Sequence, residues 1–131
     1  MQYLGVLLAA AAAYGFGAVW YMSLSKQWMA AAGVACDENG KPLNTSIAPF
    51  ILSAIAMVVV AGMLRHIMIM SQLSTLVDGL MVGVGLGLFI ALPWVVINYA
   101  YAGRPRMLTS IDGTYAVVGC TLIGVVLSFF L

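Results

Sequence analysis

The chain carries very little charge. Of its 131 residues only 7% are charged, with five basic side chains, four acidic ones and a single histidine. Soluble domains carry roughly a quarter charged residues, so this composition excludes an ordinary soluble fold. A net charge of +1 supplies neither the basic surface that nucleic acid needs nor a polybasic arm for lipid surfaces. We therefore expect no nucleic-acid partner.

Side chains suited to catalysis or metal binding are equally scarce. One histidine and four acids, placed at the boundaries of apolar runs, form no Ser-His-Asp, Cys-His or paired-carboxylate arrangement. Met63, His66 and Met70 share one helix face and could hold Cu(I), but isolated methionines in such segments are usually apolar filler. Cys36 and Cys120 differ in membrane depth, so both are predicted to be free thiols. We predict no enzymatic activity, metal or cofactor.

Long apolar runs take the place of charge. Hydrophobic residues make up 64% of the chain, and the mean hydropathy is +1.10. A helix that spans a bilayer needs about 20 apolar residues, and four stretches are long enough: 2–22, 47–70, 76–100 and 108–131. In lipid an isolated strand would leave its backbone polar groups unpaired. The sequence therefore predicts an all-α integral membrane four-helix bundle, with residues 1–131 as one domain in the lipid bilayer.

The distribution of basic residues predicts the orientation of the bundle. Lys26, Lys41, Arg104 and Arg106 follow the first and third spans, whereas Arg65 alone lies on the opposite side. Cytoplasmic loops are enriched in Lys and Arg. The bias places both of the more basic segments in the cytoplasm and both termini outside.

The first of these cytoplasmic segments, about residues 23–46, is the longest loop. Ser25 can cap a short helix over Lys26–Ala32 that Gly33 ends, and such a helix would lie along the membrane interface. Aromatic residues near this boundary fit an aromatic belt; they are Trp20, Tyr21, Trp28, Tyr99 and Tyr101.

The stretch "GRPRMLTSIDGTY", residues 103–115, gathers charge between two apolar runs. Arg104 and Arg106 just beyond a span are typical of a topology anchor. Asp112 is expected in the first turn of the last span, with Thr109 or Ser110 as N-cap, where the helix dipole favours an anion. Pairing of Asp112 with either arginine would neutralise it. The alternative is a carboxylate that handles a proton or substrate.

Further polar residues lie near this stretch and at the opposite end. Tyr115 shares a helix side with Asp112. Pro93 is expected to kink the third span, and Asn98 follows it. At the outer interface Arg65 is expected to reach Asp78 across a short turn and neutralise it.

Small residues recur four apart within the spans, a pattern that lets helices approach closely in lipid. The third span has Gly79, Gly83, Gly87 and Ala91; the fourth has Ala116, Cys120, Gly124 and Ser128; the first has Gly5, Ala9, Ala13 and Gly17. We interpret these rows as helix-packing faces, within the subunit or between subunits.

Five short motifs resemble a known family. They are "VWY" at 19–21, "KQWMAAAG" at 26–33, "DG" at 78–79, "GRP" at 103–105 and "IDGTY" at 111–115. In this order they are similar to the small bacterial membrane proteins of domain-of-unknown-function family 1761. The resemblance implies a four-helix membrane fold and a bacterial inner-membrane location, and it implies no established activity.

Two functions are compatible with these observations. The first is a non-enzymatic helical membrane protein that packs through its small-residue faces, as a homo-oligomer or as an accessory subunit of a larger complex. The second is a small dimeric transporter or channel for an ion or small solute that uses Asp112, Arg104, Asn98 and the Pro93 kink. A polar cavity reaching the middle of the membrane would distinguish the second from the first.

Overall fold

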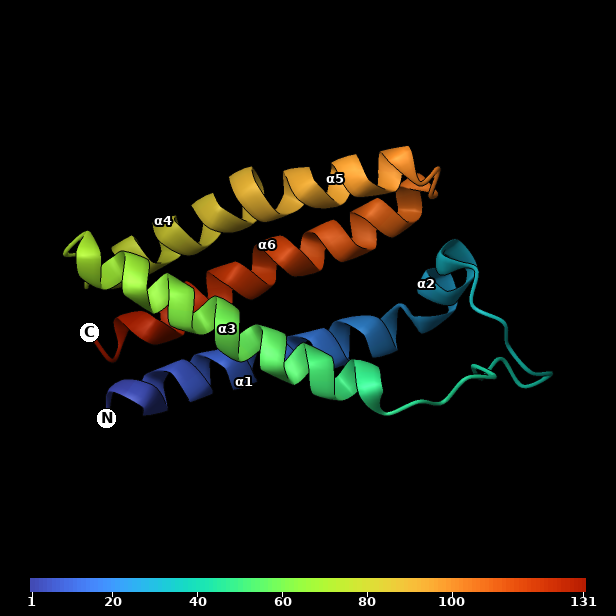
Figure 1. Ribbon diagram of the computed structural model, residues 1–131, viewed down its shortest axis with the longest axis horizontal. Coiled ribbons are helices and arrows are strands. Elements are labelled where there is room, and N and C mark those ends of the chain that lie inside the picture. The colour runs from blue at the N-terminus through green and yellow to red at the C-terminus, as the bar shows by residue number, and fades with distance from the viewer.

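The computed structural model describes residues 1–131 and is built of helices (Figure 1). Four helical stretches are long and apolar enough to cross a membrane: α1 (Gln2–Ser23), α3 (Ala48–Met70), the stretch Leu76–Tyr101 and α6 (Arg106–Ser128). The predicted all-α fold with four apolar spans is confirmed.

A short helix, α2 (Ser25–Ala32), follows the first span. The prediction of a helix here is right, but Ser25 is not its cap, because it already belongs to the helix and Leu24 precedes it as N-cap. Gly33 ends α2 with φ of 72°, a left-handed conformation that glycine adopts without the steric cost of a Cβ.

The third span is interrupted near its middle. It consists of α4 (Leu76–Leu86), a π-helical turn η1 (Gly87–Ala91) and α5 (Leu92–Tyr101). Pro93 is within the first two residues of α5 and has no backbone N–H to donate to Phe89. The backbone N–H of Leu92 donates to the carbonyl of Gly87, five residues back. Directly before Pro93 the third span therefore departs from α-helical hydrogen bonding and forms a π-helical turn.

The last span begins earlier than predicted. Pro105 is the N-cap of α6, and the helix starts at Arg106, since proline suits the residue before a helix but not its interior. Thr109 and Ser110 are therefore inside α6 and do not cap it. Asp112 lies in the second turn and not in the first, which corrects the expectation from the sequence.

Helix α6 is central to the bundle and contacts every other helix. In Figure 1, α4, η1 and α5 run along one side of α6, and α1 and α3 lie on the other. Both termini and the turn between α3 and α4 are at one end, whereas α2 and the turn between α5 and α6 are at the other. The core is wholly apolar: Val6, Ala9, Ala10, Ala13, Ala61, Leu64, Met68, Ile123 and Leu127.

Candidate functional site

The carboxylate of Asp112 joins four helices at the α2 end of the bundle. Tyr21 at the end of α1 donates its hydroxyl to Oδ1 at 2.6 Å, and Trp28 of α2 donates its indole Nε1 to the same oxygen at 3.2 Å. Tyr99 of α5 donates its hydroxyl to Oδ2 at 2.5 Å. One carboxylate on α6 thus bonds a side chain from each of three other helices. We call these four residues the Asp112 cluster.

The donors of this cluster are all electrically neutral. Asp112 is half-buried within a membrane span, where an unsatisfied carboxylate would cost several kcal/mol. Hydrogen bonds to an ionised acceptor are stronger than those between neutral groups. The three donors therefore stabilise the anion at a position where no basic side chain bonds it.

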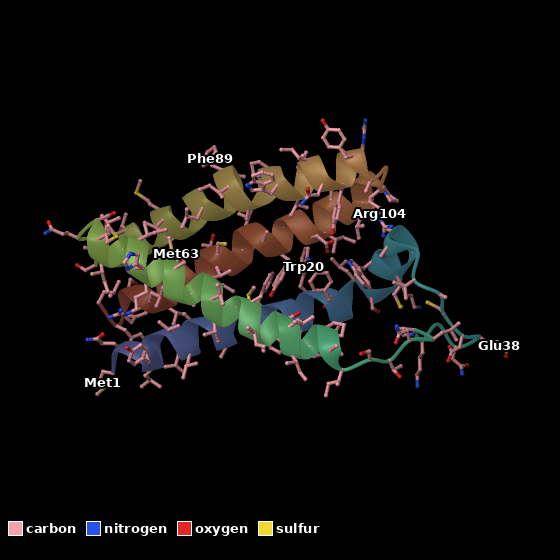
Figure 2. The ribbon with its side chains drawn as sticks, in the orientation of Figure 1. Met1, Trp20, Glu38, Met63, Phe89 and Arg104 are labelled. Atoms are coloured by element: carbon pink, nitrogen blue, oxygen red, sulfur yellow. The ribbon has the colours of Figure 1, made fainter.

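Aromatic rings extend the Asp112 cluster along α1 and α6. Tyr21 contacts Trp28 edge to face with ring centres 6.0 Å apart, and it contacts Tyr115 in the same way at 5.3 Å. Phe16 stacks on both Tyr115 and Trp20. Trp20 lies between α1 and α6 (Figure 2) and donates its Nε1 to the carbonyl of Ile111 at 3.0 Å. Such ring pairs add about 0.5–1.5 kcal/mol each beyond their burial.

The two arginines of the 103–115 stretch do not pair with Asp112, which corrects the expected ion pair. Arg104 donates to the carbonyl of Ala32 at the C-terminal end of α2, where a cation complements the helix dipole. Figure 2 shows Arg104 at the α2 end of the bundle. Arg106 is exposed at the first position of α6. Asp112 lies six residues deeper into the helix, and neutral donors occupy its oxygens.

Tyr115 lies beside the Asp112 cluster, and Asn98 lies apart from it. The hydroxyl of Tyr115 is 3.5 Å from the carbonyl of Ala13 and 3.5 Å from the sulfur of Met57, so it faces α1 and α3. Asn98 is exposed on α5. Of the predicted polar cluster, only Asp112 and Tyr115 are therefore together in the interior, and the remaining members are at the surface.

The expected Arg65–Asp78 pair is absent, and this prediction is wrong. Thr75 accepts a bond from the backbone N–H of Asp78, while the Asp78 carboxylate accepts the N–H of Thr75 at 2.9 Å and that of Ser74 at 3.2 Å. This reciprocal capping box fixes Asp78 at the start of α4. Arg65 is half-buried, and its Nε has no hydrogen-bond partner.

The small-residue rows of α4 and α6 face each other. A Cβ placed on Gly79 would overlap the carbonyl oxygen of Gly124. A Cβ placed on Gly83 would be 2.6 Å from the Cα of Thr121. A Cβ on Gly87 would be 2.7 Å from the Cα of Val117. The backbones of the two helices are in direct contact along this seam. The seam also includes Cys120 and lies beside Ala116. The row is therefore used within the subunit.

The sequence alone does not assign three members of the Asp112 cluster to a site. It predicts that Tyr21, Trp28 and Tyr99 belong to an aromatic belt, which explains their depth in the membrane but not their hydrogen-bond partner. The motifs "VWY", "KQWMAAAG" and "IDGTY" contain Tyr21, Trp28 and Asp112. Their joint occurrence was the available signal that these residues belong together.

The fold and the cluster define a multi-pass helical membrane protein. Residues 4–128 match the family model DUF1761, described as a protein of unknown function, and the chain belongs to this family. Comparison with curated proteins and with solved structures found no match.

Proposed function

We propose that the chain is a non-enzymatic protein of the bacterial inner membrane that functions as a homo-oligomer, with α1 of one copy packed against α1 of another. Both termini are proposed to be periplasmic, with residues 23–46 in the cytoplasm. The observation that carries this proposal is an outward row of small residues in the middle of α1.

The outward row consists of Ala11, Gly15 and Ala18. Ala11 and Ala18 are exposed, and a Cβ placed on Gly15 would have no atom within 4 Å. Packing between helices in lipid depends on close van der Waals contact, which small residues permit. The other rows are already occupied: Gly83 meets the α6 backbone, and Gly17 meets Tyr115. The row on α1 is left for a contact with another copy.

The apolar centre of the bundle favours a homo-oligomer over a transporter. Apolar side chains such as Ala13, Leu64, Met68 and Ile123 occupy its centre, and every buried side chain is apolar. A transporter needs polar groups along a path through the membrane. An α1 contact between subunits would leave this apolar packing intact.

The proposal is tested by comparing Gly15→Leu with Gly85→Leu. Gly85 in α4 is a matched control, because a Cβ there also meets no atom within 4 Å, so neither substitution disturbs the subunit itself. The measurement is the protein mass in mild detergent, by light scattering or native mass spectrometry. We expect a dimer for the wild type and for Gly85→Leu, and a monomer for Gly15→Leu.

Two results would contradict the proposal. One is a wild-type protein that is monomeric in detergent and in lipid nanodiscs. The other is an unchanged dimer in Gly15→Leu. A cysteine at Ala18 that cross-links in the membrane to a different protein, and not to a second copy, would assign the accessory-subunit role in its place.

A further inference from the structure

Two grooves lie side by side on the outside of α6, near the α2 end of the bundle. The first has a volume of about 460 Å³ and lies between α6 and the third span, with Leu88, Leu92, Val117 and Val118 among its lining residues. The second, of about 320 Å³, lies between α6 and the α1–α2 junction, and its lining includes Trp20.

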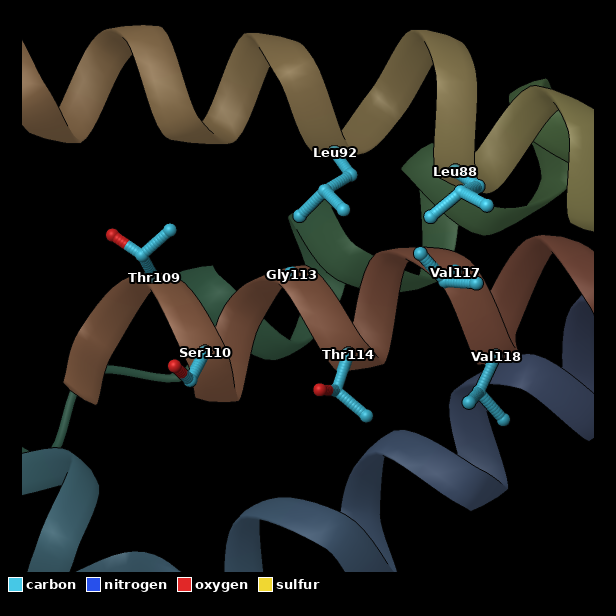
Figure 3. A pocket seen from close by; sticks show the side chains of 8 residues that line it. All are labelled: Leu88, Leu92, Thr109, Ser110, Gly113, Thr114, Val117 and Val118. Atoms are coloured by element: carbon cyan, nitrogen blue, oxygen red, sulfur yellow. The ribbon is translucent and has the colours of Figure 1, made fainter. Parts of the chain in front are cut away.

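The two grooves share a ridge. Ser110 and Thr114 line both of them, and they are one turn apart on the exposed face of α6. Figure 3 shows their hydroxyls at the surface of α6, with Leu88 and Leu92 pointing toward this helix from the third span. Leu92 approaches α6 so closely that a Cβ on Gly113 would be 2.5 Å from its Cδ1. The two grooves, whose walls are mostly apolar, thus flank a line of hydroxyl groups.

A positive charge lies at the end of this ridge. Arg106 precedes Ser110 by one turn and Thr114 by two, so it continues the same face of α6 toward the interface. Its side chain is exposed at the first helical position. Lys26 adjoins the groove residue Gln27 on α2. Asp112, the acidic side chain of α6, accepts hydrogen bonds from Tyr21, Trp28 and Tyr99 and forms no ion pair with Arg106.

We propose that the paired grooves bind one anionic diacyl phospholipid. Its phosphate pairs with Arg106, its glycerol region meets the hydroxyls of Ser110 and Thr114, and one acyl chain lies in each groove. Arginine matches phosphate oxygens in a charge-assisted, bidentate geometry, and this charge complementarity identifies the headgroup.

The length of the grooves identifies the remainder of the ligand. On α6 the first groove reaches Val118, twelve residues or about 18 Å beyond Arg106 along the helix axis, and the second reaches Thr114, eight residues or about 12 Å beyond it. Both distances are close to half of the roughly 30 Å hydrocarbon core. A ligand that begins at Arg106 and fills both grooves therefore has one charged end and two apolar tails confined to one leaflet. A free phosphate would leave both grooves unfilled.

The test is native mass spectrometry of the detergent-purified protein with phosphatidylglycerol and phosphatidylcholine of identical acyl chains. We expect the wild type to retain one phosphatidylglycerol in preference to phosphatidylcholine, and Arg106→Gln to lose this preference by about tenfold, as expected for one charge-assisted bond. Lys41→Gln removes a charge from an exposed loop position and should retain the lipid.

A second pair of variants tests the grooves themselves. Ser110→Leu places a larger side chain on the ridge between the two grooves without changing charge. It should reduce the bound lipid by a similar factor. Ser53→Leu is its matched control, because Ser53 is also exposed and its hydroxyl also bonds the carbonyl four residues back, as that of Ser110 does. Ser53→Leu should retain the lipid. Unchanged unfolding temperatures would show that all four variants are folded.

Several outcomes would overturn the proposal. Equal losses in Lys41→Gln and Arg106→Gln would assign the binding to general surface charge. Full retention in Ser110→Leu, or displacement of the lipid by glycerol phosphate alone, would place binding at the headgroup without the grooves. A cysteine at Ser110 that cross-links two copies would assign the grooves to a second copy of the chain.

Discussion

Asp112 places a negative charge inside a membrane span and receives hydrogen bonds from neutral groups alone. Each bond to an ionised acceptor contributes about 1.5–3 kcal/mol, so three bonds offset much of the cost of removing the carboxylate from water. Because Tyr21, Trp28 and Tyr99 belong to three different helices, the same bonds hold these helices to α6. The charge thus has a structural role that does not depend on a counter-ion.

This role predicts the effect of removing single polar atoms. Asp112→Asn keeps the side-chain shape but replaces one acceptor oxygen by a donor, so it should lower the free energy of unfolding by about 2 kcal/mol. Tyr99→Phe should lower it by about 1–2 kcal/mol. Tyr101→Phe is the control, because Tyr101 is 92% exposed, and it should change stability by less than about 0.5 kcal/mol. Equilibrium unfolding in mixed micelles provides the measurement.

The double variant separates a direct bond from an indirect effect. If Asp112 and Tyr99 act through their shared hydrogen bond, the combined loss in Asp112→Asn/Tyr99→Phe should be smaller than the sum of the two single losses. Additive losses would contradict this role. Proton- or solute-coupled flux that Asp112→Asn abolishes without a change in unfolding would assign a transport function to the cluster.

Only part of the Asp112 cluster could be predicted from the sequence. The sequence indicates Asp112, because a carboxylate near an apolar run is unusual, and its neighbour Tyr115, because the two lie on the same side of the helix. The donors Tyr21 and Trp28 are 91 and 84 residues away from Asp112, so their contact depends on how α1 and α2 cross α6. Hydropathy predicts the depth of a residue in the membrane. It does not predict the rotation of the helix about its axis, which decides which neighbouring helix the side chain faces.

At the scale of helices, α4 and α6 are held by contact between their backbones. Gly79, Gly83 and Gly87 leave no room for side chains at this seam, because their missing Cβ positions are occupied by atoms of α6. In lipid such close packing replaces the hydrophobic driving force that joins helices in water. The glycine row therefore fixes both the spacing and the rotation of these two helices.

The seam predicts a position-dependent response to leucine. Gly83→Leu should lower the free energy of unfolding by about 3 kcal/mol or prevent assembly, because α6 backbone atoms cannot move aside as a side chain can. Val84→Leu, the next residue and off the seam, should change it by less than about 0.5 kcal/mol. Unfolding in mixed micelles and the yield of folded protein measure both. Equal tolerance at the two positions would remove the packing argument.

Element boundaries were predictable where composition sets them and not where local backbone geometry does. The four spans follow from apolar length, and the kink expected at Pro93 stays a prediction. The π-helical turn at Gly87–Ala91 was not predicted, because a shift from four-residue to five-residue bonding leaves no hydropathy pattern. The start of α6 at Arg106 was missed because Thr109 and Ser110 are common caps, whereas Pro105 determined the boundary.

At the scale of the whole molecule, the two ends of the bundle differ in charge. The end with α2, the long loop and the α5–α6 turn carries Lys26, Lys41, Arg104 and Arg106, whereas the end with both termini carries Arg65. The helices therefore separate the basic residues into two groups across the membrane. This asymmetry is the physical basis for the proposed orientation.

The orientation predicts which positions a membrane-impermeant thiol reagent reaches in intact cells. Cys36 is exposed in the long loop, so in a Cys120→Ala background it should be labelled only after the cells are permeabilised. A cysteine at Gln2, in a background that also lacks Cys36, should be labelled directly, because the N-terminus is proposed to be periplasmic. Arg104 and Arg106 are two of the four basic residues on the proposed cytoplasmic side. Replacing both with Gln should weaken the charge difference between the two sides and yield a mixture of the two labelling patterns. Direct labelling of Cys36 together with protection of the cysteine at position 2 in the otherwise unaltered protein would reverse the orientation.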